Sequence, residues 1–180
     1  MLDTLHFKSK CYVWGMPSPV GHALGGAILG AALGTLGTRG IVVPMIAAVA
    51  PDIDFLWGRH SMETHSIGAA IVAGLVVFAW RRNKRLAVVT TLAVLSHVLF
   101  DWLGSDETPP LGVMALWPFN SHFYFANAYI FEAITRRYWL DNFFTHNAWA
   151  VAKEIILLGP PTFIAFRWRA RRRSRLQDTA

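Results

Sequence analysis

Residues 86–103 read LAVVTTLAVLSHVLFDWL, an apolar run whose two ionisable side chains, His97 and Asp101, stand near its end. The run is close in length to the ~20 residues that cross a bilayer as an α-helix. Its length and apolar character predict a helix rather than a strand. Because His97 and Asp101 are four residues apart, a helix places them on one face, one turn from each other.

Four further apolar stretches flank this run, at about residues 19–37, 41–57, 66–80 and 148–168. Of the 180 residues, 54% are hydrophobic and 16% are charged, whereas soluble domains carry about a quarter charged residues. This composition favours a membrane protein over a very apolar soluble helical domain. We predict an all-α fold, an integral membrane bundle of about five short helices with an aromatic-rich outer loop.

The first apolar stretch carries Gly26, Gly30 and Gly34 at intervals of four residues. This small-xxx-small pattern lets a membrane helix approach its neighbours closely. The alternative is that glycines simply recur in apolar sequence. Pro51 is expected to break the second stretch before its aspartates, because proline has no N–H to donate.

The net charge of +6 is concentrated at the ends of the apolar stretches. Four basic residues separate the third stretch from the fourth, and six end or follow the fifth: Arg81, Arg82, Lys84, Arg85, Arg167, Arg169, Arg171, Arg172, Arg173 and Arg175. The positive-inside rule places both groups in the cytoplasm. A nucleic-acid partner is therefore disfavoured, since its binding site would form a basic patch along one face. The partner that we expect is the lipid bilayer.

We divide the chain into an N-terminal segment (1–18), a membrane helical domain (19–168) and a basic C-terminal tail (169–180). The opening residues lack the apolar core of a cleavable signal peptide, so insertion is expected to use the internal stretches, giving a multi-pass membrane protein. Cys11 has no second cysteine to pair with, which excludes an intramolecular disulfide. Residues 104–147 form the extracytoplasmic loop, where we expect an interfacial amphipathic helix near residues 129–140. A lid over a site is the other role that the loop could have.

Histidine and aspartate residues fall where the apolar stretches begin or end. If the helices alternate in direction, these ends share the extracytoplasmic side of the bundle. The residues concerned are His22, Asp52, Asp54, His60, His65, His97 and Asp101. Imidazoles with carboxylates suit Zn²⁺, Mn²⁺ or Fe²⁺, so we predict a site for one or two divalent ions, Zn²⁺ first. The alternative is a set of structural contacts, such as a hydrogen-bonded His97–Asp101 pair that fastens two helices.

The motifs GHALGG, PDID, H-x-x-x-THS, SHVLFDW and LWPF resemble, in their order and spacing, the YdjM/YbcI-like family of membrane-bound predicted metal-dependent hydrolases. The resemblance covers residues 22–119 and extends towards residue 154. It implies a multi-helix inner-membrane protein in which the seven His and Asp residues named above match the polar motif positions. The sequence departs from the family pattern at residues 60–62, where His-Arg-Gly is frequent, and at residues 120–122, where a basic residue is common. These departures bear on substrate contacts more than on metal ligands.

A metal ion with an open coordination position activates water at neutral pH. A site at the membrane rim under an aromatic loop suits a lipid or lipid-linked phosphoester. We therefore predict a membrane-bound metal-dependent hydrolase in which Glu63, Asp106 or Glu154 shuttles protons. A non-enzymatic protein with a structural metal or polar cluster is the alternative. A transporter ranks last, because the polar residues crowd one end of the bundle rather than its full depth.

Overall fold

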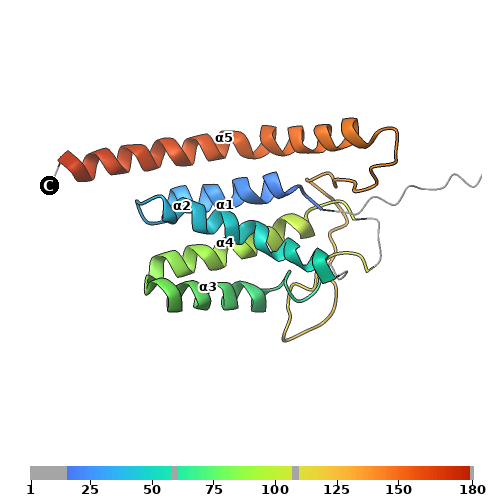
Figure 1. The fold of residues 1–180 in the computed structure, drawn as a ribbon, viewed down its shortest axis with the longest axis horizontal. Helices are drawn as coiled ribbons and strands as arrows, with labels where there is room; N and C mark the ends of the chain where they lie inside the picture. The colour runs from blue at the N-terminus through green and yellow to red at the C-terminus, as the bar shows by residue number, and fades with distance from the viewer. Residues whose placement is uncertain (1–15, 58–60, 107–109, 179–180) are drawn as a thin grey trace, which may run out of the picture.

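The computed structural model describes residues 16–57, 61–106 and 110–178. Within these ranges the regular elements are helices, as the sequence predicts (Figure 1). The elements are α1 (Pro19–Leu33), α2 (Arg39–Val49), the 3₁₀ helix η1 (Ala50–Trp57), α3 (Ile67–Arg81), α4 (Lys84–Trp102) and α5 (Phe143–Asp178). The described loops form isolated bridges, such as that between Val113 and Tyr124, in place of strands.

Polar caps set the starts of three helices. The Ser18 side chain accepts a hydrogen bond from the Gly21 amide at the start of α1, where Pro19 is the first helical residue. Ser66 and Asn83 cap α3 and α4 in the same way. The α-helix of the second apolar stretch ends at Val49, before Pro51 and the aspartates as predicted, but the chain then continues as the 3₁₀ helix η1, which was not predicted.

Close helix packing explains the glycines of α1. A Cβ atom on Gly26 would lie 2.5 Å from the Pro44 carbonyl oxygen, and one on Gly30 would lie 2.7 Å from the Gly40 carbonyl oxygen. Both partners belong to α2, so the glycines allow the two backbones to touch. Behind this seam, small residues of α2, α3 and α4 form the apolar core: Ala47, Ala48, Ala70, Ala93 and Val94.

The helices alternate in direction, so that the long loops gather at one end of the bundle (Figure 1). The opposite end holds the α1–α2 turn, the arginine-rich junction of α3 with α4 and the arginine-rich end of α5, and we call it the basic end. At the basic end, α5 continues to Asp178 through the residues that the sequence assigned to a separate tail. The Arg169 side chain is buried there and donates to the carbonyl oxygens of Gly30 and Gly37. Arginine is also a good helix former, and cations are favoured near a helix C-terminus.

The interfacial helix expected at residues 129–140 does not form, and the prediction was wrong. The backbone of this segment is paired with distant partners instead. The Ile134 amide donates to the Met16 carbonyl, the Ser105 amide donates to the Phe131 carbonyl, and the Thr135 amide donates to the Asn147 side chain. These tertiary hydrogen bonds replace the local i→i+4 pattern of a helix.

In the part of the chain that the structure describes, two helices, α4 and α5, are by length and composition apolar enough to cross a membrane. Large apolar side chains are exposed on the outer faces of the bundle, among them Leu75 and Val76 on α3 and Ile156 and Phe163 on α5. Exposed apolar surface of this extent is typical of contact with lipid or with another protein.

Candidate metal centre

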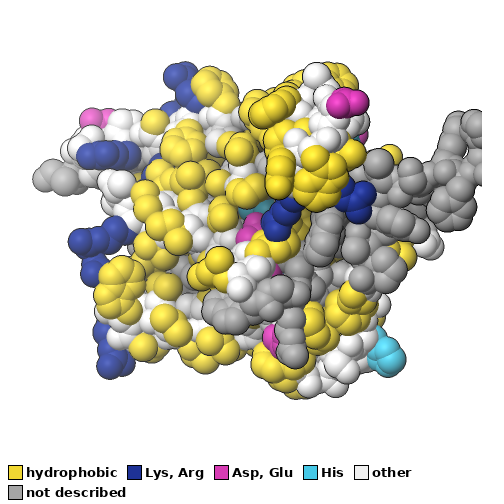
Figure 2. All heavy atoms as spheres, turned by 45° about the vertical axis from the view of Figure 1, so that its right-hand side comes forward, with side chains coloured by type: hydrophobic (Ala, Val, Ile, Leu, Met, Phe, Trp, Pro, Cys, Tyr) yellow, Lys and Arg dark blue, Asp and Glu magenta, His cyan; other side chains and the backbone are white. Residues whose placement is uncertain are grey.

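The loop end of the bundle brings together five of the seven predicted ligands. They come from four elements: His22 from α1, Asp52 from η1, His65 from the turn before α3, and His97 and Asp101 from α4. The three imidazoles are completely buried, and Asp101 is 4% exposed. Figure 2 shows acidic and histidine side chains at the centre of this face, beside basic side chains and surrounded by hydrophobic ones.

Asp101 lies at the centre of the cluster. Its Oδ1 is 3.2 Å from Nε2 of His22, and its Oδ2 is 3.2 Å from Nε2 of His65 and 3.0 Å from Nε2 of His97. Asp52 approaches from η1, with Oδ1 3.8 Å from Nε2 of His65 and 3.7 Å from Nε2 of His97. The rings of His22 and His97 stack with centroids 3.8 Å apart.

Contacts on the outer side of the rings fix which nitrogen points into the cluster. Nδ1 of His97 is 2.7 Å from the Ala48 carbonyl oxygen, which can only accept, so Nδ1 carries the proton and Nε2 carries the lone pair. Nδ1 of His65 is 3.1 Å from Oδ2 of Asp54, which also accepts from the Thr64 hydroxyl at 2.8 Å. In their neutral forms, both rings therefore turn an Nε2 lone pair towards the carboxylates. This is the arrangement of metal-bound histidines, which donate their other N–H to a carboxylate or carbonyl group.

The donor set fits a divalent ion. Nε2 of His22, Nε2 of His97, Oδ1 of Asp52 and both Asp101 oxygens are buried without a hydrogen-bond partner among the described residues. Acceptors that crowd together in a buried site repel each other unless a cation lies between them. Zn–N and Zn–O bonds of about 2.1 Å in a tetrahedron place neighbouring ligand atoms about 3.4 Å apart. The observed separations of 3.0–3.8 Å bracket this value.

A family model described as YdjM inner membrane protein matches residues 16–173. The chain belongs to this family. The resemblance drawn from the sequence motifs is thus confirmed, and so is the expectation of an inner-membrane protein. No curated protein and no solved structure matches the chain.

In this YdjM family protein, electrostatics also favour a cation at the cluster. Burial alone would lower the pKa of the His65 imidazole. Hydrogen bonds to three surrounding carboxylates outweigh burial and hold the pKa of His65 well above its usual 6.5. The cluster thus stabilises positive charge, which a proton or a metal ion can supply.

Two of the predicted ligands are not among these five. Asp54 is outside the group of converging atoms, against Nδ1 of His65. This contact gives Asp54 the place of an orienting carboxylate. His60 lies outside the described residues.

The three predicted proton-shuttling residues differ in their surroundings. The buried Glu154 carboxylate accepts from the Ser18 amide and hydroxyl, and it thereby ties α5 to the start of α1. The Asp106 carboxylate accepts from the Gly112 amide at 2.7 Å and braces its own loop. Glu63 is half-buried in the turn that leads to His65.

Sequence reasoning missed the contacts that Thr64 and Arg136 make with η1. The Thr64 hydroxyl fixes Asp54, and its only signal was its place in the quoted THS motif. The Arg136 guanidinium lies 3.1 Å from the centroid of the Phe55 ring and interacts electrostatically with Asp52 and Asp54. Residues 55 and 136 are too far apart along the chain for sequence spacing to reveal this contact.

Proposed function

We propose that this protein is an integral, multi-pass membrane hydrolase with a divalent metal centre on its extracytoplasmic face, acting on a lipid or lipid-linked phosphoester. The observation that carries the proposal is the set of buried imidazole and carboxylate acceptors from four elements. Their outer atoms are held by the Ala48 carbonyl, Asp54 and Thr64. A purely structural polar cluster would pair these groups as donors and acceptors, whereas here the neutral His97 ring turns its Nε2 lone pair to the Asp101 carboxylate 3.0 Å away.

The residues that would hold the ion or ions are His22, Asp52, His65, His97 and Asp101. Zn²⁺ fits this mixture of nitrogen and oxygen donors best, and Mn²⁺ or Fe²⁺ would also fit. A bound divalent ion lowers the pKa of a water molecule to about 7 and polarises a phosphoryl oxygen. Because Asp101 offers one oxygen to His22 and the other to His65 and His97, it is placed to serve one ion or to bridge two.

The surroundings of the centre favour an anionic, partly apolar substrate. Arg136 is exposed beside Asp52 and Asp54, so once a metal ion neutralises the aspartates, its guanidinium is available to a phosphate group. The exposed rings of Phe119, Tyr138 and Trp139 belong to the same loop and suit the chain of a lipid.

Among the acids, we assign proton donation to the leaving group to Glu63. The carboxylates of Glu154 and Asp106 are engaged by backbone amides, at Ser18 and Gly112. Glu63 stands two residues before His65 in the chain and is partly exposed to solvent.

The proposal is tested on protein purified in detergent, by metal analysis and by phosphodiesterase assays on lipid and soluble phosphoesters. We expect the wild-type protein to carry one or two divalent ions per chain and His97→Ala to lose them together with activity. His122→Ala is the matched control, because His122 is exposed in the loop. Glu63→Gln should keep the metal and lose most of the turnover. Wild-type metal content in His97→Ala would refute the metal centre.

One observation favours a second function, a structural metal site. The three imidazoles have no exposed surface, and closed sites with all positions filled by protein are typical of structural zinc. In that case His97→Ala would lose metal and thermal stability, and the wild-type protein would hydrolyse none of the phosphoesters.

A further inference from the structure

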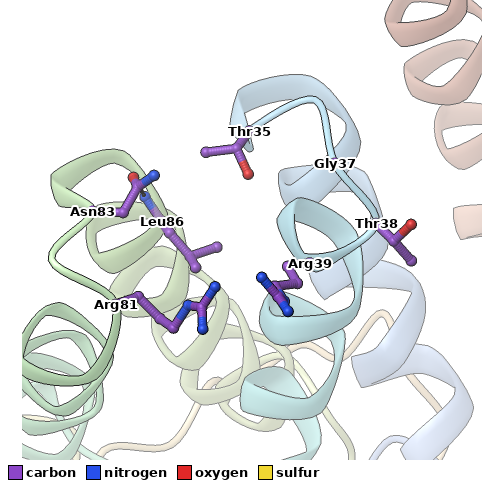
Figure 3. A pocket seen from close by; sticks show the side chains of 7 residues that line it. All are labelled: Thr35, Gly37, Thr38, Arg39, Arg81, Asn83 and Leu86. Carbon is purple, nitrogen blue, oxygen red and sulfur yellow. Dashed lines mark hydrogen bonds between the residues drawn. The ribbon is translucent and has the colours of Figure 1, made fainter.

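The end of the bundle opposite the metal cluster contains a basic cavity. It has a volume of about 490 Å³ and lies between the α1–α2 turn and the junction of α3 with α4. Its lining includes the guanidinium groups of Arg39 and Arg81 and the polar side chains of Thr35, Thr38 and Asn83. Figure 3 shows the two arginine side chains extending towards each other from α2 and α3.

The charges in this cavity are uncompensated. None of its lining residues is acidic, and among the described residues neither Arg39 nor Arg81 forms an ion pair with a carboxylate. Arg39 is the first residue of α2, where the helix dipole disfavours a cation. Facing guanidinium groups repel each other, and an anion between them removes the repulsion and accepts their hydrogen bonds.

The neighbouring surface indicates that the anion belongs to a lipid. Trp80 is 65% exposed immediately before Arg81, and the Arg81 guanidinium lies 5.0 Å from the centroid of its ring, the arrangement expected at a membrane interface. An apolar groove of about 400 Å³ lies on α3 and α4, where Leu75, Phe78 and Val88 are among the residues that line it. Basic pockets between membrane helices bind the headgroups of anionic lipids.

We propose that the cavity between Arg39 and Arg81 binds the phosphate-bearing headgroup of an anionic phospholipid. The bidentate geometry of arginine suits a phosphate better than a zwitterionic headgroup, whose ammonium group the guanidinium groups repel. The site is separate from the metal centre, so its ligand is independent of the hydrolase proposal.

The test is a calorimetric titration of the purified protein with three ligands in turn: short-chain phosphatidylglycerol, short-chain phosphatidylcholine and inorganic phosphate. We expect phosphatidylglycerol to bind with measurable affinity and phosphatidylcholine to bind at least tenfold more weakly. Arg39→Gln and Arg81→Gln should each weaken phosphatidylglycerol binding about tenfold, because each removes a charge-assisted hydrogen bond. Arg39→Lys keeps the charge and should give an intermediate loss.

Arg82→Gln is the matched control, because Arg82 carries the same charge next to Arg81 but does not line the cavity. Its affinity for phosphatidylglycerol should stay within twofold of wild type. An equal loss in Arg82→Gln would mean general charge attraction and would overturn the site. Inorganic phosphate binding as tightly as phosphatidylglycerol would overturn the lipid assignment. Thermal unfolding of each variant checks that it is folded. Among the described residues, the side chains of Arg39 and Arg81 donate no hydrogen bond to the rest of the protein, so we expect the variants to fold.

Discussion

Replacing Asp101 by asparagine probes the metal centre with almost no change in shape. Asp101 is the one residue whose carboxylate lies within 3.2 Å of Nε2 of all three imidazoles. Consider one positive charge placed beside the imidazole nitrogens, at that distance from the carboxylate. With an effective dielectric constant of about 20, it attracts the carboxylate by roughly 5 kcal/mol. The remaining amide oxygen and the lower cost of burying a neutral group offset part of this energy.

We therefore expect Asp101→Asn to weaken binding of a divalent ion by about 3 kcal/mol, or roughly a hundredfold in Kd. Competition with a chromophoric zinc chelator measures the Kd, and elemental analysis measures the metal content after purification. Asp141→Asn is the control, because Asp141 is exposed and distant from the cluster in the chain. A Kd for Asp101→Asn within threefold of wild type would refute the central place of Asp101.

Three further predictions concern orientation, packing and pH. Asp54→Asn should keep the metal stoichiometry but weaken affinity about 10- to 100-fold, as loss of an orienting carboxylate does; unchanged affinity in the chelator competition would argue against this role. Gly26→Ala should lower the thermal unfolding temperature, because its Cβ would lie 2.5 Å from a backbone oxygen, whereas Gly37→Ala has nothing within 4 Å and should be neutral; equal midpoints would contradict the close helix seam. Metal affinity should fall with decreasing pH already above pH 6.5, because His65 has a raised pKa and must lose its proton to bind the ion. For the metal-free protein the sign reverses: protonated His65 stabilises the fold at low pH, and this contribution is lost as pH rises through the raised pKa. Calorimetry at several pH values, with and without Zn²⁺, measures how metal affinity and the stability of the metal-free protein change with pH. A metal affinity that does not change with pH would contradict the prediction.

The helices were the most predictable part of the fold. Each apolar stretch became a helix, because apolar residues in runs of this length leave few other ways to satisfy the backbone. The boundaries were less predictable. Beyond Val49 the chain keeps turning as a 3₁₀ helix through Pro51, and α5 runs on to Asp178, because a helix needs no apolar residues once Arg169 anchors it.

The conformation of residues 110–142 could not be predicted. The amphipathic pattern near residues 129–140 favours a helix locally, but hydrogen bonds from Ile134 to Met16 and from Thr135 to Asn147 hold this segment in an irregular conformation. Such pairings join residues that only the fold brings together, so no local pattern announces them.

The amino-acid sequence by itself determined the helical class, the family and the end of the bundle at which the imidazoles and carboxylates emerge. The position of a residue within an apolar stretch sets its height along the bundle axis. Because the helices alternate in direction, the starts of some and the ends of others lie at the same end of the bundle. Only the tertiary structure decided which atoms meet: that Asp101 lies among three imidazoles, that Asp54 turns to the outer nitrogen of His65, and that Arg39 faces Arg81. These details depend on how each helix is rotated about its axis, and that rotation is set by close packing such as the contact of Gly26 with α2.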